Sequence, residues 1–198
     1  MGDATSRMDY ATPPEPDDLE LARALRKGCE QAAGRLVERH GRSLLAYLRA
    51  KSPDAEDLYQ ETWLRAIRRI ESFRGGNFRA WLTVIARNCM IDQARRRRPT
   101  VSLDARDKLG NSLSDTLRDA GPTAAARLAG EETRRLIAGR IAALPPDQRE
   151  IFLLRTQQEL SFAEIARMLG IPLNTALGRM HYAVTRLRRE LGMNDGHA

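Results

Sequence analysis

Residues 161–173 read Ser-Phe-Ala-Glu-Ile-Ala-Arg-Met-Leu-Gly-Ile-Pro-Leu, and this stretch predicts two helices joined by a tight turn. Ser161 and Glu164 have the spacing of a capping box, in which the serine oxygen accepts a hydrogen bond from the Glu164 amide and the glutamate side chain reaches back. Gly170 stands where a left-handed residue would end the first helix, and Pro172 suits the first turn of the next. Such a pair is a helix-turn-helix, whose second helix can enter the major groove of DNA.

The second helix is expected over residues 173–191, with one face packed inward and another open to DNA. The inward face would carry Ile171, Ala176, Met180 and Leu187. An ordinary helical hairpin with a solvated basic face is the alternative. The side chains expected to bind duplex DNA are Asn174, Thr175, Leu177, Gly178, Arg179, His181, Tyr182 and Arg186.

Upstream of this motif, apolar residues recur at helical spacing and no alternating strand pattern occurs. The sequence therefore predicts an all-α fold of two small helical domains joined by a flexible polar linker, the C-terminal domain being the helix-turn-helix. Helices are expected over 54–70 and 78–98, on either side of a loop. The expected boundaries are an acidic disordered arm over 1–18, a first domain over 19–98, a linker over 99–126, a second domain over 127–192 and a tail over 193–198.

The charge distribution favours a polyanionic partner. The chain of 198 residues has a formal net charge of +7, yet its first twenty residues carry a net charge of −5, which leaves +12 for the remainder. A chain with this balance should be attracted to nucleic acid. No apolar run approaches the roughly 20 residues needed to span a bilayer, and the N-terminus is acidic, so a soluble cytoplasmic protein that contacts no membrane is expected.

The two cysteines, Cys29 and Cys89, are too few for a disulfide framework and lack the spacing of a zinc site. Buried structural thiols are the expected role for both, and redox sensing by Cys29 or Cys89 is the alternative. The sequence predicts no metal, no cofactor and no catalytic residue, because His40, His181 and His197 are scattered and no carboxylate triad is clustered. An enzyme acting on DNA, such as a recombinase, is therefore disfavoured.

Arginines and aromatic residues alternate between residues 61 and 98. This segment holds ten arginines against three acidic residues, a net charge of +7 in 38 residues. Such a surface suits phosphates, and aromatic faces beside arginines could hold unstacked bases of single-stranded DNA. The alternative is that Trp63, Phe78 and Trp81 belong to the core of a helical domain, which is the more common situation, and that the arginines at 95–98 are a solvated helix end.

Three segments resemble the extracytoplasmic-function (ECF) sigma factors, the small two-domain members of the sigma-70 family. Residues 54–65, Asp-Ala-Glu-Asp-Leu-Tyr-Gln-Glu-Thr-Trp-Leu-Arg, resemble the helix with which the family binds core RNA polymerase. Residues 72–98 resemble its minus-ten-recognition segment. Residues 144–150, Leu-Pro-Pro-Asp-Gln-Arg-Glu, together with the helix-turn-helix, resemble its minus-thirty-five-binding domain.

The resemblance implies a sigma factor that binds bacterial core RNA polymerase, directs it to promoters and assists promoter melting. Its partners would be the polymerase, promoter DNA in duplex and melted form, and an anti-sigma factor. The polymerase would be bound by Asp54, Asp57, Gln60, Glu61 and Leu64. The minus-ten element would be bound by Arg74, Asn77, Phe78, Arg79, Arg87, Asn88, Asp92, Arg95 and Arg96, and the minus-thirty-five element by the eight residues of the second helix.

The second helix departs from the family pattern at three positions. Family members often have basic residues where Leu177 and Tyr182 stand and a small hydroxyl residue at Gly178. Leucine cannot make the bidentate guanine contact of an arginine, and glycine lowers helix propensity by about 1 kcal/mol relative to alanine. A stand-alone helix-turn-helix regulator remains the alternative function.

Overall fold

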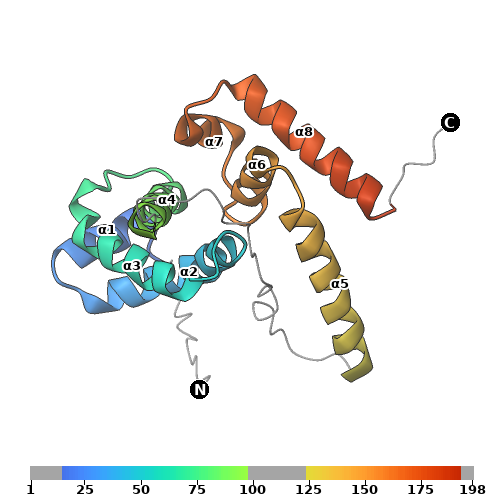
Figure 1. Cartoon of the computed structure of the whole chain (residues 1–198). Helices are drawn as coiled ribbons and strands as arrows, with labels where there is room; N and C mark the ends of the chain where they lie inside the picture. Colours follow the sequence, from blue (N-terminus) through green and yellow to red (C-terminus); the bar gives the residue numbers. More distant parts are fainter. Residues whose placement is uncertain (1–14, 98–123, 193–198) are drawn as a thin grey trace, which may run out of the picture.

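The computed structural model describes residues 15–97 and 124–192, and no strand occurs in those two ranges. The first range contains α1 (Asp18–Arg26), α2 (Glu30–Arg49), α3 (Ala55–Arg68), the short 3-10 helix η1 (Ile70–Ser72) and α4 (Phe78–Arg97). The second contains α5 (Ala124–Ala142), α6 (Pro146–Thr156), α7 (Phe162–Leu169) and α8 (Leu173–Glu190). The predicted all-α class is confirmed (Figure 1).

The two helical groups lie on either side of residues 98–123, so most of the predicted linker falls outside the described residues. The same holds for most of the predicted arm and for the tail. Helix α5 begins at Ala124, inside the range that the sequence assigned to the linker. In Figure 1 this helix extends away from the others, whereas α6 lies beside α2 and α4.

An aromatic cluster packs the start of α4 against α2 and against the loop that precedes α4. The Phe78 ring is 5.1 Å from Phe73 and 5.2 Å from Trp81, measured between centroids, and 5.1 Å from the His40 ring on α2. Phe73 and Phe78 are fully buried, Trp63 is buried and Trp81 is half-buried. The core interpretation of these aromatic side chains is therefore the correct one in this structure.

The loop between η1 and α4 is held from α1. The Arg26 guanidinium donates to the backbone carbonyl of Ile70, at 3.3 Å, and to that of Phe73. Gly75 and Gly76 have φ values of 110° and 85°, a region that side chains strongly disfavour, so the turn requires glycine at both positions. These contacts hold the loop in one conformation, which places Phe78 in the core.

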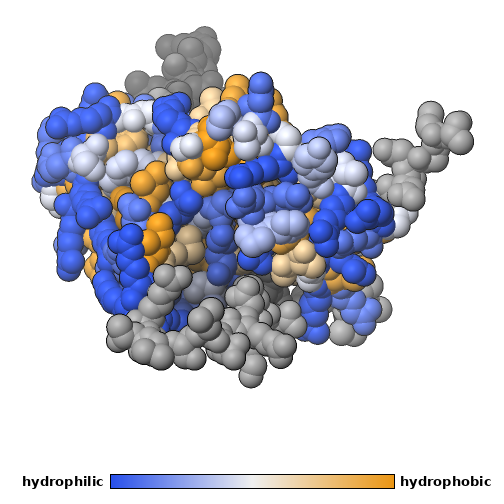
Figure 2. Space-filling view, turned by 45° about the horizontal axis from the view of Figure 1, so that its top comes forward, coloured by the Kyte–Doolittle hydropathy of each residue, from blue (hydrophilic) through white to orange (hydrophobic). Residues whose placement is uncertain are grey.

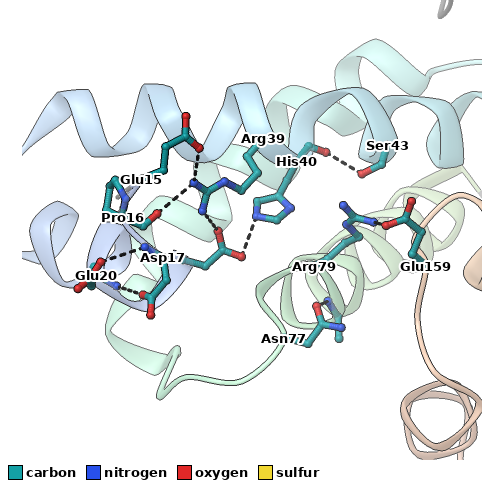
Figure 3. A network of polar contacts seen from close by, with 12 residues as sticks. Glu15, Pro16, Asp17, Glu20, Arg39, His40, Ser43, Asn77, Arg79 and Glu159 are labelled. Atoms are coloured by element: carbon teal, nitrogen blue, oxygen red, sulfur yellow. Dashed lines mark hydrogen bonds and ion pairs between the residues drawn. The ribbon is translucent and has the colours of Figure 1, made fainter. Parts of the chain in front are cut away.

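A polar network ties the start of α1 to α2 (Figure 3). Asp18 accepts from Arg39 at 2.8 Å and pairs with His40 at 3.0 Å. Burial lowers the pKa of His40 although Asp18 opposes this, so the imidazole is neutral near pH 7. Arg39 also donates to the carbonyl of Pro16, at 3.0 Å, which places the chain leading into α1 against α2.

The turn between α7 and α8 confirms the predicted capping. The Ser161 hydroxyl accepts from the Glu164 amide at 3.2 Å, and a Glu164 carboxylate oxygen accepts from the Ser161 amide at 2.8 Å. Gly170 ends α7 with φ 65° and ψ 35°, and the Ile171 amide bonds to the Ala166 carbonyl at 3.0 Å. Pro172 then precedes the first residue of α8.

The cysteines occupy different environments. Cys89 is buried in α4, where burial raises the pKa of its thiol. Cys29 lies at the start of α2 and is exposed, so the expectation of two buried thiols is wrong for this residue. Its position before the first turn of a helix, where few apolar neighbours are available, explains the difference.

Apolar side chains are also present on the surface. Figure 2 shows apolar patches among the hydrophilic side chains of one face. Among the described residues no helix is both long and apolar enough to cross a bilayer. The large apolar side chains that remain exposed are Leu64, Ile67, Val84, Ile91, Leu136, Ile137, Leu173, Leu177 and Tyr182.

The conformation of Gly170 predicts opposite effects for two glycine substitutions. An added Cβ would meet no atom within 4 Å at either Gly170 or Gly34, but Gly170 has a positive φ and Gly34 lies inside α2. Gly170→Ala should therefore lower the free energy of unfolding by about 1 kcal/mol through backbone strain. Gly34→Ala should raise it by roughly 0.5–1 kcal/mol through helix propensity. Urea denaturation followed by circular dichroism measures the free energy of unfolding of both variants. A change of the same sign in both would contradict the left-handed conformation of Gly170.

Candidate polymerase and nucleic-acid interfaces

One face of α3 carries the residues predicted to bind polymerase. Asp57, Gln60, Glu61 and Leu64 follow the spacing that places side chains in one stripe along a helix. Asp57 and Gln60 are exposed, and Leu64 is 50% exposed although it is apolar. We call these four residues the α3 stripe. An exposed leucine among acidic and amide groups is suited to a protein partner rather than to DNA.

Asp54, the fifth predicted polymerase-binding residue, stands at the start of α3 rather than on the stripe. Its carboxylate forms an ion pair with Arg97 of α4, at 2.5 Å. This contact joins the beginning of α3 to the end of α4. In this structure Asp54 therefore positions two helices, and its carboxylate is less available to a partner.

An arginine on α3 connects the stripe to α4. Arg65 pairs with Glu61 on its own helix and with Asp92 on α4, at 2.6 Å in each case. The hydrogen bond from Arg65 lowers the pKa of Asp92, so this carboxylate stays ionised. An ionised carboxylate beside the arginines of α4 repels phosphate. In this structure Asp92 acts as a brace between α3 and α4, and its role as a DNA contact stays a prediction.

The predicted minus-ten residues divide into three groups. Arg74, Asn88, Arg95 and Arg96 are exposed. Phe78 is only 1% exposed, so the prediction that it contacts DNA is wrong for this structure; its apolar ring is more stable in the aromatic cluster than in water. Asn77, Arg79 and Arg87 each contact the second helical group, and their partners are described next.

A buried carboxylate of α6 lies between α2 and α4. Glu150 is 9% exposed and accepts from the Tyr47 hydroxyl at 2.9 Å, from Arg87 Nε at 3.1 Å and from the Lys51 ammonium. Burial alone raises the pKa of Glu150, but Lys51 and Arg87 overcome this effect and lower it, so the carboxylate is ionised. We call Tyr47, Lys51 and Arg87 the Glu150 socket.

Further contacts extend along α4 towards α7. The Asn77 amide donates to Glu164 at 2.8 Å. Arg79 pairs with Glu159, as Figure 3 shows. Arg87 also donates to the Met168 carbonyl at 3.3 Å. Three predicted DNA-binding side chains thus have protein acceptors instead of phosphates in this structure.

Helix α8 presents the predicted duplex-binding face to solvent. Asn174, Leu177, His181 and Tyr182 are exposed, Thr175 and Gly178 are half-exposed, and Ala176 and Leu187 are buried as expected. Two of its basic side chains have acidic neighbours: Arg179 pairs with Asp147 at 2.6 Å and Arg186 with Glu190 at 2.9 Å. The face therefore offers fewer uncommitted cations than the sequence suggested.

Comparison with known proteins agrees with this arrangement. Residues 36–100 match Sigma-70 region 2, and residues 134–187 match Sigma-70, region 4. The ECF RNA polymerase sigma factor SigW of Bacillus subtilis is 33% identical over 141 residues, which cover 70% of this chain and 75% of that protein. The chain belongs to the ECF sigma factors. As a member of this family it binds RNA polymerase and directs it to promoters.

Other relatives extend the match over most of the sigma factor. The ECF RNA polymerase sigma-E factor of Salmonella typhimurium is 30% identical over 173 residues, which cover 84% of this chain and 90% of that protein. The structure of CnrH in complex with the cytosolic domain of CnrY has 27% identity and a TM-score of 0.61, covering 90% of this chain and 99% of that one. Sigma factors are non-enzymatic transcription initiation factors.

Sequence reasoning missed the residues that join the two helical groups. Glu150 was noted only as part of the segment 144–150, while Tyr47, Lys51 and Gln158 were not singled out. The signal that could have drawn attention to Glu150 is its position, because a charged residue directly before the apolar pair Ile151 and Phe152 falls close to the inward face of an amphipathic helix. Its partners, about 60 to 100 positions away, leave no local signal.

The assignment of Asp92 as a brace gives a prediction about DNA binding. Asp92→Asn should leave affinity for a single-stranded oligonucleotide unchanged or increase it, because a negative charge beside Arg95 and Arg96 is removed. Arg95→Ala should weaken binding and make the dependence of log affinity on log salt shallower by about 0.7, the value for one lost phosphate contact. Fluorescence anisotropy over a salt series measures both. A loss of affinity in Asp92→Asn equal to that in Arg95→Ala would restore Asp92 as a DNA contact.

Proposed function

We propose that the α3 stripe is the surface with which this sigma factor binds the clamp helices of the largest polymerase subunit. The observation that carries the proposal is the exposure of Asp57, Gln60 and Leu64 on one helix face that has no partner within the described residues. The Arg65 brace and the Asp54–Arg97 pair hold this face rigidly over α4. Rigid placement lowers the entropy lost when a partner is bound.

The adjacent helix α4 would hold the melted non-template strand of the minus-ten element. Four exposed side chains, Arg74, Asn88, Arg95 and Arg96, together with Arg79 and Arg87 once these leave their present acceptors, give a cationic path for a single strand. The loop at 72–77 would help to form a pocket for a flipped base. The half-buried Trp81 is the aromatic side chain that can still offer part of a ring to that base.

Helix α8 would bind the minus-thirty-five element as a duplex. Two of its exposed apolar residues, Leu177 and Tyr182, can contact thymine methyl groups but cannot replace the bidentate guanine contact of arginine. We therefore infer that this domain anchors the factor upstream with a modest sequence preference. Binding energy from α8 would add to that from α4 because the two sites are covalently joined.

The mechanism contains no covalent step by this chain. Polymerase performs the chemistry, while the sigma factor positions it and assists melting by capturing unpaired bases. Unstacking costs a few kcal/mol, which stacking and phosphate contacts must offset. This role requires the factor to work in the cytoplasm, where polymerase and the chromosome are. An anti-sigma factor is a further proposed partner, supported by the solved structure of a sigma factor with a similar fold, RpoE of Bartonella quintana, in complex with the anti-sigma factor NepR.

Transcription in vitro tests the promoter-directing role of this chain. The factor is mixed with bacterial core polymerase and a library of genomic fragments from its own source, and start sites are sequenced. Reproducible start sites that appear only when the factor is present would support the role. If the factor produced no initiation on any fragment and did not associate with core polymerase, the promoter-directing role would be excluded.

The proposed α3 surface predicts a selective loss of polymerase binding. Asp57→Arg combined with Gln60→Ala should weaken the affinity for core polymerase at least tenfold, because a charge is reversed and an amide removed in the middle of the stripe. Binding of the full chain to duplex DNA should not fall. Glu38→Arg combined with Gln31→Ala, on exposed positions of α2, is the matched control and should bind polymerase like the wild type. Equal effects of the two double variants would contradict the assignment.

A further inference from the structure

A hollow of about 510 Å³ lies between α1 and the first turns of α2, within the first helical group. We call it the α1–α2 hollow. Its volume is that of a small-molecule site, since such sites commonly enclose roughly 300–1,000 Å³. None of the residues predicted to bind polymerase or DNA lines it. The hollow is therefore a feature that the proposed function leaves unexplained.

Three cationic side chains converge on this hollow from two helices. Arg23 lies in the last turn of α1, Lys27 directly follows that helix, and Arg35 lies in the second turn of α2. All three are exposed, and in the part of the chain that the structure describes no carboxylate pairs with any of them. They differ in this from Arg26 and Arg39, which donate to carbonyl and carboxylate acceptors.

The acidic residue of the lining does not balance this charge. Glu20 lines the hollow, but its carboxylate accepts from the Asp17 amide at 3.0 Å and completes the cap of α1 (Figure 3). The lining thus carries three positive charges against one negative charge. Like charges that share a small volume repel one another, so a bound anion would stabilise this grouping.

Helix preference accounts for only part of the cationic cluster. Basic residues near the end of a helix are favoured by its dipole, which explains Arg23 and Lys27. Arg35 has no such reason, because it lies near the start of α2, where the dipole favours acidic residues. Binding of one anionic ligand would give all three side chains a common role.

The rest of the lining suits an organic group rather than a bare ion. Leu21 and Ala32 are buried and contribute apolar surface at the base of the hollow. Gln31 is exposed and offers an amide that can both donate and accept hydrogen bonds. An organic ring can therefore rest on apolar surface beside a polar side chain while its anionic group meets the cations.

We propose that the α1–α2 hollow is a binding site for a nucleotide with a polyphosphate group. The phosphates lie against Arg23, Lys27 and Arg35, because guanidinium and ammonium groups form strong charge-assisted hydrogen bonds with phosphate oxygens. The nucleoside lies over the apolar base of the hollow, within reach of Gln31. Single-stranded DNA fits this site less well, because a strand carries one phosphate per nucleotide whereas the hollow gathers three cations in one place.

This site is independent of the surfaces assigned to polymerase and promoter DNA. The α3 stripe lies on another helix, and Arg26, which holds the loop before α4, is not among the residues that line the hollow. Nucleotide binding can therefore be measured on the full chain without polymerase or a promoter. Its failure would leave the proposed function untouched, and the reverse is also true.

Cys29 provides a chemical probe inside the hollow. It is exposed and lines the hollow, whereas Cys89 is buried in α4 and serves as an internal reference. Alkylation by N-ethylmaleimide, followed by peptide mass spectrometry, measures the reaction rate of each thiol. A ligand that covers Cys29 slows its alkylation by the factor 1 + [L]/Kd, which is about elevenfold at a concentration ten times Kd.

ATP and GTP are the test ligands, in magnesium-free buffer so that their phosphates keep their full charge. At least one of them should slow alkylation of Cys29, and inorganic tripolyphosphate should do so only at higher concentration, because it lacks the nucleoside. No protection by either nucleotide in the millimolar range would overturn the proposal. Protection by tripolyphosphate at the same concentration as by the nucleotides would also overturn it, in favour of a site for any polyanion.

A pair of variants with equal charge tests whether the three cations hold the ligand. The hollow variant combines Arg23→Gln, Lys27→Gln and Arg35→Gln. The control combines Arg42→Gln, Arg68→Gln and Arg140→Gln, at exposed positions outside the hollow. Because all six side chains are exposed, both variants should keep the helical circular dichroism spectrum of the wild type.

The hollow variant should raise the Kd for the protecting nucleotide about tenfold or more, because three charge-assisted donors are lost. The control should bind like the wild type. Each variant is compared with itself, with and without nucleotide, since neighbouring cations also affect the reactivity of the thiol. An equal loss of affinity in the two variants would overturn the proposal, because net charge rather than the hollow would then hold the nucleotide.

A dT12 oligonucleotide separates this site from a nucleic-acid surface. It should leave alkylation of Cys29 unchanged, and it should bind the hollow variant and the control with equal affinity in fluorescence anisotropy. If dT12 protected Cys29 better than ATP and GTP, and the hollow variant lost that protection, the hollow would belong to a single-strand path and the nucleotide site would be rejected.

Discussion

The ionised carboxylate of Glu150, buried against α2 and α4, is the constraint on which the arrangement of the two helical groups depends. Removing a charge from water costs several kcal/mol unless partners compensate, and a hydroxyl, an ammonium and a guanidinium do so here. Such a site contributes more to specificity than to stability. The three donors together restrict where α6 can lie, and the buried apolar residues that both groups contribute to one cluster reinforce this placement.

The aromatic cluster imposes a second constraint, within the first helical group. Phe78 is both the first residue of α4 and the centre of the cluster formed with Phe73, Trp81 and His40. Because this ring is buried, its packing sets the orientation of α4 and therefore the direction in which the arginines of that helix lie. The family resemblance suggested Phe78 as a DNA contact. In this structure its buried ring instead orients α4, the helix that carries the predicted DNA-binding side chains.

Local features of the fold were predictable because their causes are local. The capping box at Ser161 and Glu164, the left-handed Gly170 and the limits of α8 follow from neighbouring residues, and all were confirmed. Periodicity likewise placed Ala176 and Leu187 inside α8 and left Leu177 outside. The family resemblance suggested the residues of the α3 stripe, and helical spacing explains why these four share one face.

Features that depend on distant pairs were not predictable. Nothing in the sequence around Asp92 indicates that Arg65 neutralises it, and nothing around Arg79 or Arg87 indicates acceptors on α6 and α7. Charge counting treated every arginine of residues 61–98 as free, whereas several are committed within the fold. The composition of a surface thus overstates its electrostatic potential when acidic residues from another part of the chain are folded against it.

The α3 stripe is accessible, whereas central arginines of α4 are paired with carboxylates. This contrast affects how strongly the protein binds chromosomal DNA without sequence specificity. Chromosomal phosphate offers a vast number of weak sites that could trap a basic protein before it meets polymerase. A chain whose central arginines already have carboxylate partners competes poorly for those sites but presents its polar stripe in full.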